Sequence, residues 1–154
     1  MTEDIIAHVG IYGAAIVIGM ISSAVPIGGA EAFVATVVIA WTRDPWLVVL
    51  IGVLVAFGQI AAKVPMYYGA RGATRLANPA PDGKLARVKR WVERWKNSPI
   101  LLTMVSAITG VPPFYLLPLF AGMLELSLEM LLVVGFIGRV IRFVAIGLIA
   151  LYAT

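Results

Sequence analysis

The sequence predicts an all-α integral membrane protein, because it is far more apolar than a soluble domain and its apolar residues form long segments. Of its 154 residues, 61% are hydrophobic and only 13% are charged. A soluble globular domain has about 45–50% apolar and about 25% charged residues. About three of the apolar segments are long enough to cross a hydrocarbon core of roughly 30 Å as helices. A single transmembrane domain over residues 1–154 is therefore expected.

The three predicted membrane helices cover residues 5–24, 46–68 and 126–152. The first contains small residues suited to close helix packing, namely Gly10, Gly13, Ala14, Ala15 and Gly19. The second follows a polar turn at 43–45, in which Pro45 is a favourable first helical residue, and Pro65 is expected to kink or end it just after Lys63. It contains small and polar residues at helical spacing, which predict a face turned toward the protein interior: Gly52, Ala56, Gln59 and Lys63.

Proline and glycine interrupt two further apolar stretches, residues 25–41 and 98–124. The interruptions contain Pro26, Gly28 and Gly29 in the first stretch, and Gly110, Pro112 and Pro113 in the second. Such backbone is tolerated inside a membrane only where protein or a wet cavity satisfies it, so each stretch is predicted to be a re-entrant hairpin. Broken segments at matching positions of two halves, here 5–69 and 98–154, are typical of inverted-repeat transporters with a midplane site.

Positive charge is concentrated in residues 70–97, between the two predicted halves. The basic residues are Arg71, Arg75, Lys84, Arg87, Lys89, Arg90, Arg94 and Lys96. The positive-inside rule places such a loop in the cytoplasm, so the N-terminus is expected to be cytoplasmic, the C-terminus outside, and the two hairpins opposed. Within the loop, 84–97 has the pattern of an amphipathic helix lying in the headgroup layer. Nucleic-acid binding is the other interpretation of a basic run, and the lipid-embedded flanks disfavour it.

Four ionisable residues lie within apolar stretches: Glu31, Lys63, Arg139 and Arg142. A charge at the bilayer centre costs at least about 2.5–3.5 kcal/mol, so it is rarely kept without a use. Arg139 and Arg142 share one helix face near the middle of the last segment. We expect them to form a midplane transport site with Glu31, with Lys63 as a third cation, and with Gln59, Pro26, Gly28, Gly29, Pro112 and Pro113 around it. The excess positive charge favours an anionic ligand such as a phosphate group.

Purely structural roles are the alternatives for these charges. Glu31 could cap the short helix that follows it, since a carboxylate is favourable near a helix start. Arg139 and Arg142 could bond backbone carbonyls freed by the second broken hairpin. Lys63 lies near the cytoplasmic end of its helix and could extend its ammonium group to the surface.

The sequence contains no recognisable catalytic machinery. It has no cysteine and a single histidine, and it lacks a Ser-His-Asp set and a phosphate-binding loop. We therefore expect neither an enzyme nor a metal or organic cofactor.

Several segments resemble the DedA/VTT superfamily, also called the SNARE-associated Golgi protein family. The resemblance covers about residues 15 to 150 and rests on 25–31 (VPIGGAE), 66–72 (MYYGARG), 110–114 (GVPPF) with Ala121-Gly122, and 138–143 (GRVIRF). It implies two opposed re-entrant hairpins packed with membrane helices, and a role in moving lipids between leaflets. Members are implicated in phospholipid scrambling or polyprenyl-phosphate recycling, some coupled to proton or sodium gradients. The second hairpin departs from the bacterial pattern, because Ser106, Thr109, Pro112 and Pro113 stand where basic residues are often found.

Three functional classes follow for this chain. The first is a flippase or scramblase for an anionic phospholipid or polyprenyl-phosphate headgroup, with membrane lipids as its partners. The second is a small ion-coupled exporter of cationic compounds, which the excess positive charge disfavours. The third is a structural or pore-forming membrane protein. The small-residue faces permit a homo-oligomer without requiring one, and the simple anchors and lack of cysteine suit a bacterial inner membrane.

Overall fold

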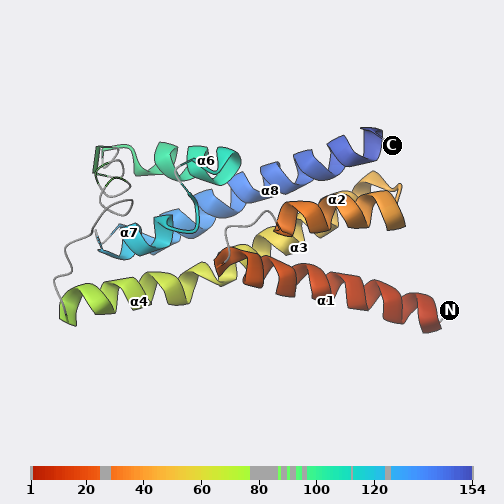
Figure 1. Cartoon of the computed structure of the whole chain (residues 1–154), viewed down its shortest axis with the longest axis horizontal. Helices are drawn as coiled ribbons and strands as arrows, with labels where there is room; N and C mark the ends of the chain where they lie inside the picture. The colour runs from red at the N-terminus through yellow and green to blue at the C-terminus, as the bar shows by residue number, and fades with distance from the viewer. Residues whose placement is uncertain are drawn as a thin grey trace. The chain divides into compact units, whose positions relative to one another are not determined.

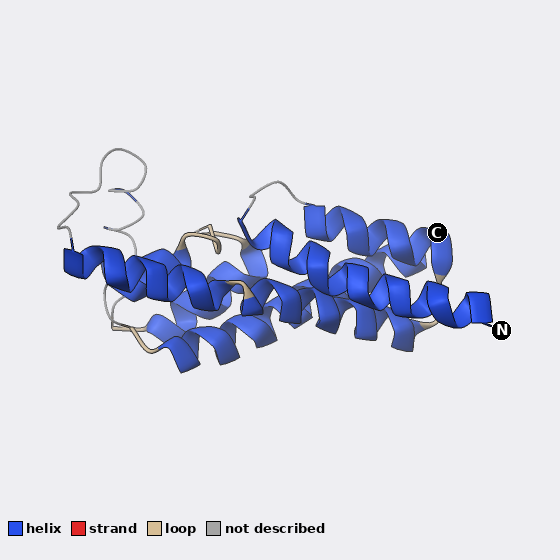
Figure 2. Ribbon diagram, turned by 90° about the horizontal axis from the view of Figure 1, so that it is seen from below, coloured by secondary structure: helices blue, strands red, loops and turns tan. Residues whose placement is uncertain are grey.

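The computed structural model describes residues 2–24, 29–76, 87, 90, 93–94, 97–111, 113–123 and 126–153. These residues form helices joined by short loops, with no strand among them (Figures 1 and 2). The helices are α1 (Thr2–Ala24), α2 (Gly29–Trp41), α3 (Pro45–Ala61), α4 (Lys63–Leu76), α6 (Pro99–Thr109), α7 (Leu117–Met123) and α8 (Leu128–Ala153). Within the described ranges, three helical stretches are long and apolar enough to cross a membrane: Ala7–Ala24, Pro45–Ala73 and Leu128–Ala153. The predicted all-α class with about three such helices is confirmed.

The chain folds into two compact units. Unit 1 contains residues Met1–Ala62 and Arg139–Thr154, and unit 2 contains Lys63–Gly138. These units do not coincide with the predicted halves 5–69 and 98–154, because the continuous helix α8 contributes residues to both.

Local chemistry explains where several helices begin and end. Asp44 precedes α3, and its Oδ1 accepts a hydrogen bond of 3.0 Å from the backbone N–H of Trp46. Pro45 then occupies the first turn, where no N–H is needed. Helix α6 ends at Gly110, whose φ of 81° is the left-handed conformation that glycine adopts without strain. The predicted turn at 43–45 and the predicted interruption at Gly110 are both confirmed.

The predicted helix over 46–68 is interrupted by a turn at Ala62, which separates α3 from α4. Pro65 is the physical reason. It has no N–H to donate to the carbonyl of Ala61, and its ring crowds that carbonyl. The kink was expected just after Lys63, but a proline disturbs the turn that precedes it.

Helices α1 and α3 of unit 1 approach each other through two glycines. A Cβ added at Gly19 would meet the backbone carbonyl of Val55, and one added at Gly58 would meet that of Ile16. Ala15 lies on the same face of α1 and is fully buried. Nothing lies within 4 Å of a Cβ added at Gly10 or Gly13, so only part of the predicted small-residue face packs against another helix. The reason is helical spacing, since Gly10 and Gly13 point to the opposite side of α1 from Ala15 and Gly19.

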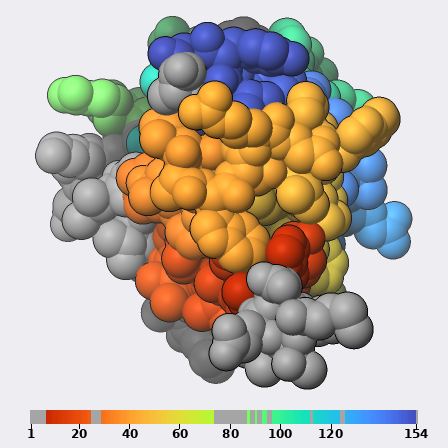
Figure 3. All heavy atoms as spheres, turned by 90° about the vertical axis from the view of Figure 1, so that its right-hand side faces the viewer, coloured from red at the N-terminus to blue at the C-terminus, as the bar shows by residue number. Residues whose placement is uncertain are grey.

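Helix α2 and the C-terminal part of α8 complete unit 1. A Cβ added at Gly147 of α8 would lie only 2.5 Å from Cγ1 of Val48 in α3, so glycine lets α8 pack closely on α3; Val34 and Val38 of α2 lie 3.4 and 3.7 Å from the same position. Figure 1 shows that α2 and this part of α8 run in the same direction, opposite to α1 and α3. Figure 3 views unit 1 from the end where α2 finishes, and α2 (orange) lies between α1 (red) and the end of α8 (dark blue).

Helix α1 begins at the same end of unit 1 as the turn between α2 and α3. The ring of His8 lies 4.9 Å from that of Trp41, measured between centroids, and α8 also finishes at this end (Figure 1). In unit 1 the start of α1 and the end of α8 therefore lie at one end, which argues against the expectation that the two chain ends lie on opposite sides of the membrane. Helix α2, Gly29–Trp41, returns the chain to the end at which α1 begins.

In unit 2, α4 packs along α7. The hydroxyl of Tyr67 donates a hydrogen bond of 2.6 Å to the backbone carbonyl of Leu126, which follows α7. A Cβ at Gly122 would meet the backbone carbonyl of Tyr67, so this glycine allows the two helices to touch. Helices α6 and α7 contain 11 and 7 residues, fewer than the roughly 20 that cross a membrane.

Candidate functional site

Glu31, Arg139 and Arg142 come together in unit 1, as the sequence predicts for three of its four deep charges. The Nε of Arg142 donates a hydrogen bond of 3.1 Å to Oε1 of Glu31. The same oxygen lies 3.9 Å from Nη1 of Arg139. One carboxylate oxygen is thus shared between two guanidinium groups, and we call these three residues the charged cluster.

The position of each residue in its helix brings the charged cluster together. Glu31 lies in the first turn of α2, a favourable place for a carboxylate, so this residue both suits the helix start and forms an ion pair. Arg139 and Arg142 lie on either side of the middle of α8 and share one of its faces. Further along α8, the Cβ position of Gly147 lies 3.4 Å from Val34 and 3.7 Å from Val38 of α2, so the two helices are in contact beyond the cluster.

The three side chains differ in exposure. Arg139 is the most enclosed, with 10% of its side chain exposed, and its guanidinium carbon lies 6.0 Å from the centre of the Phe143 ring. Glu31 and Arg142 are 25% and 26% exposed, so a ligand can reach both. Two guanidinium groups and one carboxylate leave one excess positive charge. Such a group can attract an anion, and arginine is well suited to phosphate oxygens.

A polar contact between α1 and α3 involves Gln59, which the sequence singled out, and Ser22, which it did not. The Nε2 of Gln59 donates a hydrogen bond of 3.0 Å to Oγ of Ser22, which itself donates to the carbonyl of Gly19. The signal that could have identified Ser22 is the Ser22-Ser23 pair, the only side-chain polarity in the last two turns of an apolar helix.

Lys63 belongs to unit 2, where its ammonium nitrogen lies 5.3 Å from the centre of the Phe114 ring. Only 2% of the residue is exposed, so the interpretation in which Lys63 extends to the surface is wrong. A ring face attracts the ammonium group and offers it an alternative to water. The whole predicted stripe of Gly52, Ala56, Gln59 and Lys63 is buried, which confirms that it faces inward.

The other predicted site residues belong to the two interruptions. Pro26, Gly28 and Pro112 lie outside the described residues. Gly29 begins α2, and Pro113 is half-buried in the loop between α6 and α7. Most of the predicted interfacial helix at 84–97 also lies outside the described residues. Its described members Arg87, Arg90, Glu93 and Arg94 are helical and exposed.

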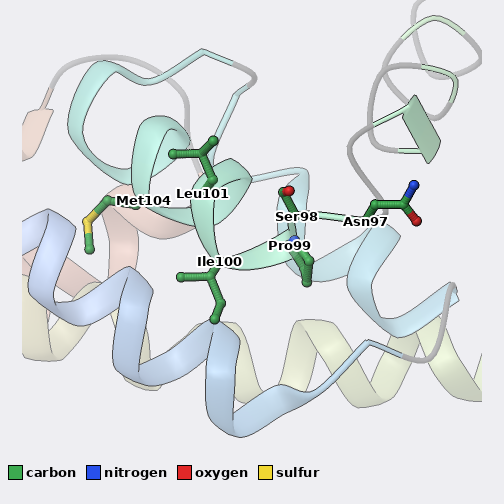
Figure 4. Close-up of a pocket in the computed structure, with 6 residues that line it drawn as sticks. All are labelled: Asn97, Ser98, Pro99, Ile100, Leu101 and Met104. Atoms are coloured by element: carbon green, nitrogen blue, oxygen red, sulfur yellow. The ribbon is translucent and has the colours of Figure 1, made fainter.

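A separate open pocket lies at the start of α6 in unit 2, with a volume of about 470 Å³. Its lining residues are Asn97, Ser98, Pro99, Ile100, Leu101 and Met104 (Figure 4). Asn97 and Ser98 lie at one side of the view, and the apolar Ile100, Leu101 and Met104 extend from α6 at the other. None of the predicted transport residues lines this pocket.

Comparison of the chain with models of known protein families, with characterised proteins and with solved structures found no match. The resemblance to the DedA/VTT superfamily therefore remains a prediction from short segments.

Proposed function

We propose that this chain moves an anionic lipid headgroup between membrane leaflets, as a flippase or scramblase, with the charged cluster as the site that the headgroup passes. The single observation that carries the proposal is a carboxylate of the short apolar helix α2 that is shared by two arginines of α8, a helix of membrane-spanning length and composition. Charges at such a position are costly and are usually functional.

The depth of the cluster supports this role. Trp41, at the end of α2, and Tyr152, near the end of α8, are both exposed, and aromatic residues of this kind gather at the membrane surface. Glu31 lies ten residues before Trp41, and Arg142 lies ten residues before Tyr152. Ten helical residues rise about 15 Å, which is half of a hydrocarbon core of roughly 30 Å. This spacing supports a position of the cluster near the middle of the membrane.

The partial exposure of the cluster is more consistent with binding of a passing ligand than with a fully buried ion pair. Arg142 and Glu31 are each about one-quarter exposed, whereas Arg139 is enclosed. In the proposed mechanism, a phosphate oxygen contacts Arg142 first. Arg139 supplies a second positive charge at the same depth, and Glu31 balances one of the two arginines when no headgroup is present.

The proposal includes the architecture implied by the family resemblance. Helix α2 has 13 residues and α6 has 11, and each is too short to cross a membrane. In the proposed arrangement both belong to re-entrant hairpins of an inverted repeat, in a bacterial inner membrane with the basic segment 70–97 in the cytoplasm. A proton or sodium gradient could drive the transport.

A structural role is the second candidate, because the Glu31–Arg142 pair joins α2 to α8 and could serve only to hold them together. Export of a cationic compound is less consistent with the excess positive charge of the cluster. The two candidate roles predict different properties for variants in which the pair is broken. A structural pair yields an unstable protein when it is broken, whereas a transport site yields a folded and inactive one.

Leaflet exchange of a labelled anionic phospholipid, in liposomes containing the purified chain, tests the proposal. Arg139→Ala and Glu31→Gln are measured in parallel, and each variant is first checked for folding by thermal melting. Exchange of this lipid by the wild type that is lost or strongly changed in folded variants supports transport through the cluster. If well-folded wild type exchanges no lipid with any headgroup, with or without a pH gradient, the proposal fails.

A further inference from the structure

The net charge of the charged cluster determines which phosphate-bearing headgroup it can accommodate. Glu31 offers one oxygen to both arginines, so the cluster with its carboxylate ionised carries one positive charge. We propose that it selects a lipid headgroup with a single negative charge, a phosphodiester such as that of phosphatidylglycerol. This inference rests on the proposed transport function and deepens it.

Charge balance inside the membrane gives the physical reason. A phosphodiester carries one negative charge and neutralises the cluster. A phosphomonoester carries about −1.5 to −2 at pH 7, because its second pKa is near 6, so it leaves excess negative charge at the depth where charge is most costly. A zwitterionic headgroup brings its own cation beside Arg139 and Arg142, and the positive charge stays uncompensated.

The remaining charged side chains described in unit 1 lie elsewhere. Arg43 and Asp44 are exposed in the turn between α2 and α3, beyond the end of α2 that carries Trp41. Glu31 lies at the opposite end of that 13-residue helix, so about 18 Å of helix separates it from the turn. Among the described residues of unit 1, the charge that a headgroup meets at this depth is therefore set by the three residues of the cluster.

The test compares leaflet exchange of three labelled lipids: phosphatidylglycerol with one negative charge, phosphatidic acid as a phosphomonoester, and zwitterionic phosphatidylcholine. Wild type is expected to exchange phosphatidylglycerol at least about tenfold faster than either of the others, a ratio equivalent to about 1.4 kcal/mol. Glu31→Gln raises the cluster to two positive charges, and the preference is expected to move to phosphatidic acid. Arg142→Gln makes the cluster neutral, and the preference over phosphatidylcholine is expected to disappear.

The double variant Glu31→Gln/Arg142→Gln restores one positive charge and should restore the preference for phosphatidylglycerol. It also keeps the test informative if Glu31→Gln alone fails to fold. Glu129→Gln and Arg43→Gln are matched controls, because they change the same charges at exposed positions outside the cluster. Both controls are expected to keep the wild-type preference.

The outcomes separate this inference from the function on which it rests. Exchange of all three lipids at equal rates, or an unchanged preference in folded Glu31→Gln, overturns charge selection and leaves lipid transport standing. No exchange of any lipid by folded wild type refutes transport itself. A final measurement uses dimethyl phosphate, a soluble diester with the same charge. Its uptake into the liposomes at the rate of lipid exchange or faster would overturn the assignment of a lipid as the source of the phosphodiester.

Discussion

Glu31 and Arg142 are joined by a hydrogen bond of 3.1 Å although 111 residues separate them in the chain. This contact ties the first turn of α2 to the middle of α8, and Arg139 shares the same carboxylate oxygen at 3.9 Å. An ion pair between the short apolar helix α2 and the membrane-length helix α8 both stabilises their packing and places charge where a polar ligand could use it. The two contributions can be measured separately.

The stability contribution of the pair is measurable by a double-mutant cycle with Glu31→Gln and Arg142→Gln. Because both side chains are about three-quarters enclosed and directly bonded, we expect a coupling energy of about 1–3 kcal/mol. The measurement is the free energy of unfolding in mixed detergent micelles. Additive effects of the two substitutions would show that the pair contributes nothing to stability.

The close approach of α1 and α3 predicts that Gly58→Ala is destabilising. Its new methyl group would meet the backbone carbonyl of Ile16, which no side-chain rotation can move away. We expect a loss of about 1–3 kcal/mol in the free energy of unfolding. Gly13→Ala on α1 is the matched control, since nothing lies within 4 Å of its Cβ position. That variant should be neutral or slightly more stable, because alanine favours a helix by about 0.5–1 kcal/mol over glycine. Equal effects of the two substitutions would contradict the glycine contact.

The hydrogen bond from Tyr67 to Leu126 predicts a loss of stability in Tyr67→Phe. Removal of the hydroxyl leaves the carbonyl of Leu126 without this 2.6 Å donor in a buried place, and the expected cost is about 1 kcal/mol. The adjacent Tyr68 is 56% exposed, so Tyr68→Phe provides a control for loss of a tyrosine hydroxyl alone. Thermal melting of the two variants compares them directly, and a stability of Tyr67→Phe equal to that of Tyr68→Phe would argue against the bond.

The arrangement of unit 1 predicts that the start of α1 and the turn after α2 lie on the same side of the membrane. The chain has no cysteine, so single-cysteine variants report on one position each. Ala7→Cys and Arg43→Cys, both at exposed positions, should react with an impermeant maleimide added to the same face of sealed vesicles. Arg90→Cys, in the basic segment, should react from the other face. If Ala7→Cys reacted from the same face as Arg90→Cys, and Arg43→Cys reacted from the opposite face, this topology would be refuted.

Features that depend on near neighbours could be predicted from the sequence. The bounds of the first and last long helices were within a few residues of those observed, since apolar length and composition decide them. The turn before Pro45 and the helix end at Gly110 follow from the chemistry of one or two residues. The break at Ala62 was misplaced because the effect of Pro65 falls on the preceding turn.

The sequence by itself determined an all-helical chain of membrane composition, with four charges in apolar stretches and an inward-facing stripe that ends at Lys63. Only the tertiary structure decided which of those charges meet. It joined Glu31 to both arginines, buried Lys63 against Phe114, and brought the start of α1 to the end of α2. The physical reason is that a helix face is set by residues three and four apart. Which segment packs against that face depends instead on close contact between segments that are distant in the chain. Here such contact is permitted at Gly19, Gly58 and Gly147 by the absence of a side chain.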